Sequence, residues 1–154
     1  MTQATGNNVD SSSAMRGLDK IRKNVPANMR ARIGVLGADV QREGSEISNG
    51  EIGVIHEFGS ISKNIPPRSF LRMPIESHAG QLALFMGQPA MVEKVLSGAA
   101  EAAFELLGIK AEEIVQNAFA TRGFGQWQPN SPLTIAIKGS DKPLIDTSQL
   151  RRSI

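Results

Sequence analysis

The chain has 154 residues, of which 40% are hydrophobic and 21% charged, and this length and composition are typical of one globular domain rather than a disordered segment. It contains no cysteine, which excludes disulfides and thiolate metal sites. No run of 18 apolar residues is present, and the polar start "MTQATGNNVDSSS" lacks the features of a signal peptide. We therefore expect an intracellular soluble protein with no membrane contact and a flexible tail over residues 1–12.

The charges are divided unevenly along the chain, although the formal net charge is only +2. Residues 1–32 and 122–154 carry an excess of Lys and Arg, whereas residues 33–121 carry an excess of Asp and Glu. Two interpretations remain open. The division is either ordinary solvated surface, or it marks complementary faces that dock one copy, or one neighbouring protein, against the next.

The first third of the chain predicts a helix followed by a hairpin. Apolar residues recur at helical spacing over residues 13–24, and Pro26 stops that pattern. The stretches "RARIGVLG" and "EIGVIHEFG" alternate and are rich in Ile and Val, which predicts two strands within residues 31–59. A long polar loop over residues 37–50 would join them.

The rest of the chain predicts helices. Pro66 and Pro67 form a stiff elbow, after which Ser69 can cap a helical region of two or three helices that extends to about Thr121. Ser131 caps a short helix over residues 132–138, and a second helix start comes at Asp146. The expected fold is a single α+β domain: a small antiparallel β-sheet packed against a long helical middle, with two short C-terminal helices.

The motifs for enzyme chemistry are incomplete. The stretch "HEFGS" lacks the second histidine of a zinc-binding HExxH helix, no GxSxG elbow occurs, and "GFGQW" has neither the preceding strand nor the lysine of a phosphate loop. We therefore predict no catalytic residue, no cofactor and no metal, and expect that the protein is not an enzyme.

Two residue groups could mediate binding. Arginines in "PPRSFLR" and "LRRSI" could contact phosphates, but aromatic residues make up only 5% of the chain and none is tyrosine, so a base-stacking platform is poorly supplied. Trp127, which is followed by Pro129 and Pro132, is either part of the core or an interface anchor. Direct binding of DNA, or a role in its packaging, through the basic ends stays as the alternative function.

Two strings in fixed order carry a family resemblance: "IGVIHEFGS...IPPRSFLR" and, after the helical middle, "W.PNSPLTIAIKGSDKPLIDTSQLRRSI". Together they resemble the virion-morphogenesis and tail-completion (neck) proteins of tailed, Mu-like bacteriophages, over about residues 33–154. Ser148 stands where relatives often have glycine. Relatives also continue past "SI" into a further strand, so a neighbour could supply a strand that is missing here.

The resemblance implies a structural protein of the virion neck or tail, present in the host cytoplasm during assembly. It implies a ring of copies, a hexamer or a trimer, at the head-proximal end of the tail that supports head-tail joining. Its partners would be itself, the neighbouring tail-tube and neck or connector proteins and, incidentally, DNA in the lumen. The candidate interface residues are His56, Phe58, Pro66, Pro67, Arg68, Phe70, Arg72, Trp127, Pro132, Lys138, Asp146, Leu150, Arg151 and Arg152.

Overall fold

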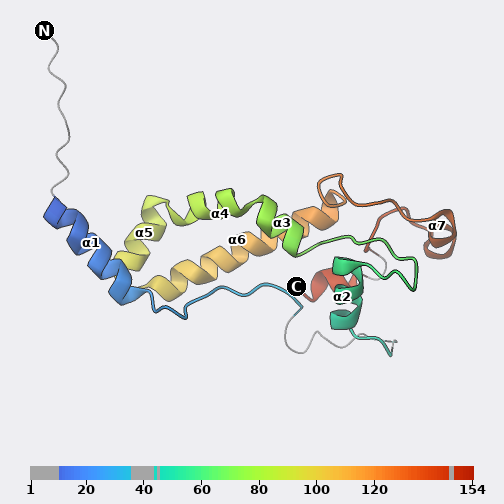
Figure 1. Ribbon diagram of the computed structural model, residues 1–154, viewed down its shortest axis with the longest axis horizontal. Coiled ribbons are helices and arrows are strands. Elements are labelled where there is room, and N and C mark those ends of the chain that lie inside the picture. The colour runs from blue at the N-terminus through green and yellow to red at the C-terminus, as the bar shows by residue number, and fades with distance from the viewer. Residues whose placement is uncertain (1–10, 36–43, 45, 146–147) are drawn as a thin grey trace, which may run out of the picture.

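The computed structural model describes residues 11–35, 44, 46–145 and 148–154, and these residues form an elongated helical protein (Figure 1). The helix α6 (Ala100–Ala120) runs along the long axis, with α3 (Arg72–Ser77), α4 (Ala79–Met86) and α5 (Pro89–Leu96) on one side of it. The segment 25–35 follows α6 on its other side. The remaining helices lie at the two ends: α1 (Ser11–Asn24) at one, and α2 (Asn49–Phe58), α7 (Pro132–Lys138) and α8 (Gln149–Arg152) at the other.

The predicted α+β fold is wrong, because strand structure in the described residues is limited to one isolated bridge, between Ser60 and Ile65. Residues 31–35 have no regular secondary structure, although Ile33 and Val35 pack against the core. The part of the chain that the structure describes therefore contains no sheet from which a C-terminal strand could be missing. Most of the loop predicted over residues 37–50 lies outside the described residues, and its last two residues begin α2.

The predicted second strand is the helix α2, and a capping box explains its start. The Ser48 hydroxyl accepts a hydrogen bond from the backbone N–H of Glu51 at 3.1 Å, and the Glu51 carboxylate accepts one from the backbone N–H of Ser48 at 2.9 Å. The buried residues of α2 are Asn49, Gly53 and Glu57, which are four residues apart and so share one face of a helix. None of them is a large apolar residue. The spacing of apolar residues therefore could not predict that this segment is a helix with one buried face.

The helix predicted over residues 13–24 is confirmed as α1, which ends before Pro26. Its C-terminal end is fixed to α5, because the side-chain amide of Asn24 donates to the backbone oxygens of Val95, at 2.7 Å, and Leu96, at 3.3 Å. The apolar residues that the pattern was built on stay exposed on the rest of α1.

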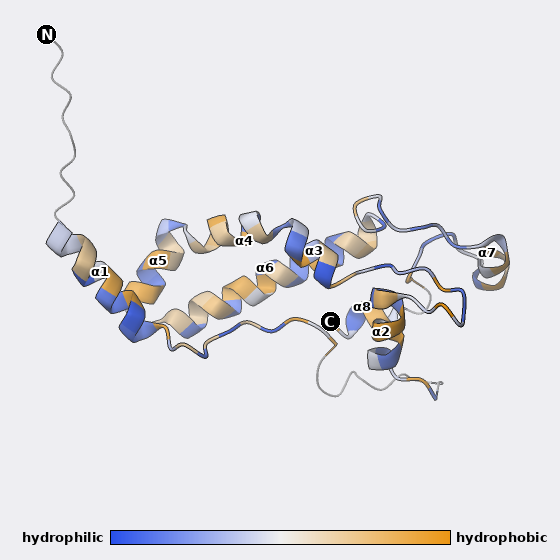
Figure 2. Cartoon of the chain, viewed as in Figure 1, coloured by the Kyte–Doolittle hydropathy of each residue, from blue (hydrophilic) through white to orange (hydrophobic). Residues whose placement is uncertain are grey.

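The helical middle is confirmed, but it contains four helices rather than two or three. Pro89 opens α5, and Gly98, at φ 92°, separates α5 from α6. Two apolar clusters form along α6: one joins Phe70, Val115, Ala118, Phe119, Trp127, Leu144 and Leu150, and the other joins Met91, Val95, Ala100 and Ala103. Figure 2 shows that apolar residues predominate along α6.

Both short C-terminal helices are confirmed. The Ser131 hydroxyl accepts from the backbone N–H of Thr134 at the start of α7, and Gly139, in the left-handed region at φ 63°, ends that helix. The residue before α8 is Ser148, and the helix start predicted at Asp146 lies outside the described residues. Among the described helices, none combines the length and the apolar composition needed to span a bilayer.

Candidate assembly surface

The carboxylate of Glu57 organises the elbow, residues 66–72. It lies on the last turn of α2 with the residue only 6% exposed. It accepts hydrogen bonds from the hydroxyl of Ser69 and from the backbone N–H groups of Phe70, Leu71 and Arg72, the last three at 2.8, 3.0 and 3.0 Å. These N–H groups precede or begin α3, so the carboxylate satisfies donors that have no partner inside the helix.

The predicted Ser69 cap is wrong in position, because the residue before α3 is Leu71. The Ser69 hydroxyl nevertheless accepts from the backbone N–H of Met73, in the first turn, at 2.8 Å. Its backbone oxygen accepts from the Trp127 indole N–H at 3.1 Å. The Trp127 ring is 7% exposed and meets the Phe119 ring edge-on at 5.7 Å between centroids. The Trp127 side chain is therefore buried within the chain, as its interpretation as a core residue expects, and its role as an interface anchor stays a prediction.

Arg68 ties the elbow to the segment before α7. Its Nε donates to the backbone oxygen of Gln128 at 2.9 Å, and Nη2 donates to that of Pro129 at 3.0 Å. A rigid guanidinium can hold two successive carbonyls in this way. Burial lowers the pKa of Arg68 from its usual value, because desolvation disfavours the charged form. We refer to Glu57, Arg68, Ser69 and Trp127 as the elbow junction.

Gly59 turns the chain directly after Glu57. It has φ 77°, and a Cβ atom built there would lie 2.9 Å from both the Ile65 backbone oxygen and the Pro67 nitrogen. Ser60 and Ile65 then exchange two backbone hydrogen bonds, at 2.8 and 2.9 Å, and close a tight turn. The turn projects Ile61, whose side chain is fully exposed.

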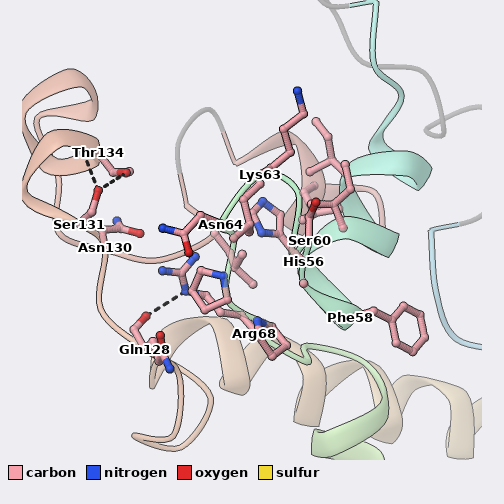
Figure 3. Close-up of a pocket in the computed structure, with 18 of the residues that line it drawn as sticks. His56, Phe58, Ser60, Lys63, Asn64, Arg68, Gln128, Asn130, Ser131 and Thr134 are labelled. Atoms are coloured by element: carbon pink, nitrogen blue, oxygen red, sulfur yellow. Dashed lines mark hydrogen bonds between the residues drawn. The ribbon is translucent and has the colours of Figure 1, made fainter.

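A groove of about 1240 Å³ lies between α2, this turn, the segment 128–131, α7 and α8 (Figure 3). We call it the distal groove. At its polar end the side chains of Asn64, Arg68 and Asn130 are directed toward the same space, while the Phe58 ring points away from them. Asn130 is buried and its amide nitrogen has no hydrogen-bond partner among the described residues. Phe58, 67% exposed, Ile61 and Leu133 supply large exposed apolar side chains to the groove.

The structure brings together half of the predicted interface residues and separates the others. The distal groove is lined by His56, Phe58, Pro66, Pro67, Arg68, Lys138 and Leu150, and Pro132 lies between two further lining residues, Ser131 and Leu133. Phe70 is fully buried in the core. Arg72 is exposed and pairs with Glu76, Arg151 donates to Gln116, and Arg152 lies on the exposed side of α8. Asp146 lies outside the described residues.

The two histidines occupy different environments. His56 lines the distal groove, while His78 contacts the Phe124 ring at 4.6 Å between centroids and has Nδ1 2.9 Å from the Pro74 backbone oxygen. Over the residues that the structure places, no group of three metal-ligating side chains occurs.

Sequence reasoning missed the role of Glu57, which it assigned to a strand and did not select as a site residue. The signal was the spacing of Ser48 and Glu51, which is that of a capping box and predicts a helix that carries Glu57. Ile61 and Leu133 were missed because isolated apolar residues carry no pattern. Comparison with models of protein families, with curated proteins and with solved structures found no match.

Proposed function

We propose that this protein is a structural component of a phage neck, which forms a ring at the head-proximal end of the tail and supports head-tail joining. The observation that carries the proposal is the elbow junction. The two parts of the sequence that resemble tail-completion proteins lie about 60 residues apart, and Arg68 and Trp127 join them by three hydrogen bonds. The residues that carry the resemblance in the two segments therefore meet in one place, and this supports the proposal.

The junction gives these residues a mechanical role. It holds α2, the turn after Gly59 and the segment before α7 in fixed positions around the distal groove. Exposed Phe58, Ile61 and Leu133 then offer apolar surface that needs little ordering before it meets a partner. A ring subunit needs rigid surfaces of this kind, because each copy must present the same geometry to its neighbours.

The test is to locate the protein in tailed particles produced from the genome that encodes it. We expect imaging at side-chain detail to show a closed ring of copies between tail tube and head. Particles made with Phe58→Asp and Ile61→Asp should show unjoined heads and tails, whereas Leu84→Asp, at an exposed site on α4, should leave joining intact. Absence of the chain from complete particles would refute the proposal.

The alternative function, binding or packaging of DNA, is favoured by one observation. Lys20, Arg22 and Lys23 are exposed on α1, and none pairs with an acidic residue of the described chain. Binding through phosphates would weaken steeply between about 50 and 200 mM salt, because each contact releases counterions. A DNA affinity that falls in this way, and is lost on Arg22→Glu/Lys23→Glu, would support the alternative.

A further inference from the structure

The helix α1 presents an apolar stripe that its own chain leaves uncovered. Met15 and Leu18 are each 60% exposed and Ile21 is 37% exposed, and they follow one another at three-residue spacing along one side of the helix. Arg22, four residues after Leu18, lies on the same side, and Lys23 follows it. The helix is therefore amphipathic and basic. It contacts α5, and its apolar side is most exposed at Met15 and Leu18.

A second, smaller groove lies across α6. It has a volume of about 310 Å³ and is formed by residues 31–33, by Ile75, by α4 and by α6. Its lining is apolar except for Arg32: it includes Leu82, Met86 and Leu107. We call it the α6 groove.

An acidic row borders this groove. Glu101, Glu105 and Glu112 are exposed on α6 and form no ion pair with a described residue, and Gly108, which lines the groove, stands in line between Glu105 and Glu112. A Cβ atom at Gly108 would meet nothing within 4 Å. Glycine disfavours a helix relative to alanine, and here it leaves open space on the surface of α6.

We propose that α1 of one copy docks in the α6 groove of a second copy, with Met15, Leu18 and Ile21 in the groove and Arg22 and Lys23 toward the acidic row. The charges are complementary, as helix-in-groove recognition favours. A helix of 14 residues, about 21 Å long, can reach from the groove at Leu107, Gly108 and Ala111 along the acidic row, which spans about 16 Å from Glu101 to Glu112.

The occupant is a second copy because α1 is held elsewhere in its own chain. Asn24 fixes the end of α1 to α5 through the backbone oxygens of Val95 and Leu96, and α1 extends from that end of the molecule away from α4 and α6 (Figure 1). The donor helix and the acceptor groove are different surfaces of one chain, so the contact is head-to-tail and generates a ring if it closes. The biological role of such a ring rests on the proposed function, whereas the contact between α1 and the α6 groove does not depend on it.

The test is a charge exchange in the full chain, measured by sedimentation velocity at low salt. Arg22→Glu/Lys23→Glu and Glu105→Lys/Glu112→Lys should each raise the dissociation constant for self-association by about tenfold or more, because like charges then face each other. Mixing the two variants should restore association, since each altered helix meets an oppositely charged groove. A wild-type chain that stays monomeric at all concentrations, or a mixture that does not associate, would overturn the proposal.

A second variant probes the groove without charge. Gly108→Leu fills open space on the monomer, so its helix content and unfolding midpoint should not fall, but its association should weaken by about tenfold or more because the groove is blocked. Gly80→Leu, at an exposed position of α4 that also has open space, is the matched control and should associate like wild type. Equal association of the two variants would contradict docking at this groove. Imaging of particles tests the proposed function separately, since copies could associate in this way outside any virion.

Discussion

The Glu57 carboxylate accepts a hydrogen bond from the backbone N–H of Phe70 at 2.8 Å, across 13 residues of sequence, and the Phe70 ring is fully buried. The end of α2 thus positions the first core residue of the helical middle. The Phe70 ring in turn packs against Phe119 of α6, at 5.4 Å between centroids. One carboxylate therefore connects the surface that lines the distal groove to the main core.

Replacing this carboxylate should destabilise the fold strongly. Glu57→Gln leaves a single acceptor oxygen and points an NH₂ group at N–H donors, so we expect a loss of about 3 kcal/mol in the free energy of unfolding. Urea denaturation followed by circular dichroism measures it. Glu93→Gln, at an exposed position of α5, is the control and should change stability by less than about 0.5 kcal/mol. Equal midpoints for both variants would show that the carboxylate does not cap α3.

Trp127 should contribute to stability rather than to association. Trp127→Ala removes a buried ring and should cost about 3 to 5 kcal/mol, while Trp127→Phe keeps most of the packing and loses only the bond to the Ser69 backbone oxygen, at about 1 kcal/mol. Thermal unfolding by circular dichroism measures both. A Trp127→Ala chain that unfolds like wild type but no longer self-associates would instead make Trp127 an interface residue.

Gly59 should not tolerate a side chain. Its positive φ and its 2.9 Å approach to the backbone of Ile65 and Pro67 mean that Gly59→Ala strains the turn, with an expected loss of about 2 kcal/mol. Gly80→Ala, in α4 with open space around it, should instead be neutral or stabilising. Chemical denaturation of the two variants compares them directly, and a stabilised Gly59→Ala chain would rule out the close approach.

The start of α2 should depend on pH. Hydrogen bonds from the backbone and the hydroxyl of Ser48 lower the pKa of Glu51 below its usual value. Because the folded-state pKa is below the unfolded one, the stabilisation is present above the unfolded pKa and is lost as pH falls through the folded pKa.

Urea midpoints of wild type and Glu51→Gln therefore should differ at pH 6 and converge as pH falls through the lowered folded-state pKa of Glu51, where the carboxylate becomes protonated. Hydrogen exchange of α2 amides offers a local readout of the same change. A difference between the two proteins that is constant from pH 6 to pH 3 would show that the capping box does not form.

The sequence predicted the helices that have strong local signals. Ser131, Pro132 and Gly139 mark the two ends of α7, and Pro26 follows the end of α1, so both helices could be placed from residue type alone. The region of α2 was wrongly predicted as a strand because Ile52, Val54 and Ile55 favour that structure. The buried face of the helix consists instead of Asn49, Gly53 and Glu57. When the buried face of a helix carries polar residues and glycine, the apolar residues of the segment show no helical spacing, so the sequence pattern does not predict the helix.

The candidate surface could be predicted only in part. Local patterns selected the proline elbow and the α7 start, and these do meet at the distal groove. They could not show that Arg68 and Trp127 are buried, because their partners lie 58 to 61 residues away in sequence. Residue type left Trp127 open between core and contact, and tertiary packing buries it, while Arg72, selected through the resemblance, forms a surface ion pair.

The long sequence separation of the elbow junction has a consequence for synthesis on the ribosome. Arg68 cannot form its two hydrogen bonds until Gln128 and Pro129 have left the exit tunnel. The core around the helical middle is therefore completed only when the last fifth of the chain has been synthesised. A nascent chain halted before Trp127 would expose the Phe70 and Phe119 rings and would be a natural client for chaperones. Chains with a closed core would thus arise only after residues 127–129 have been translated.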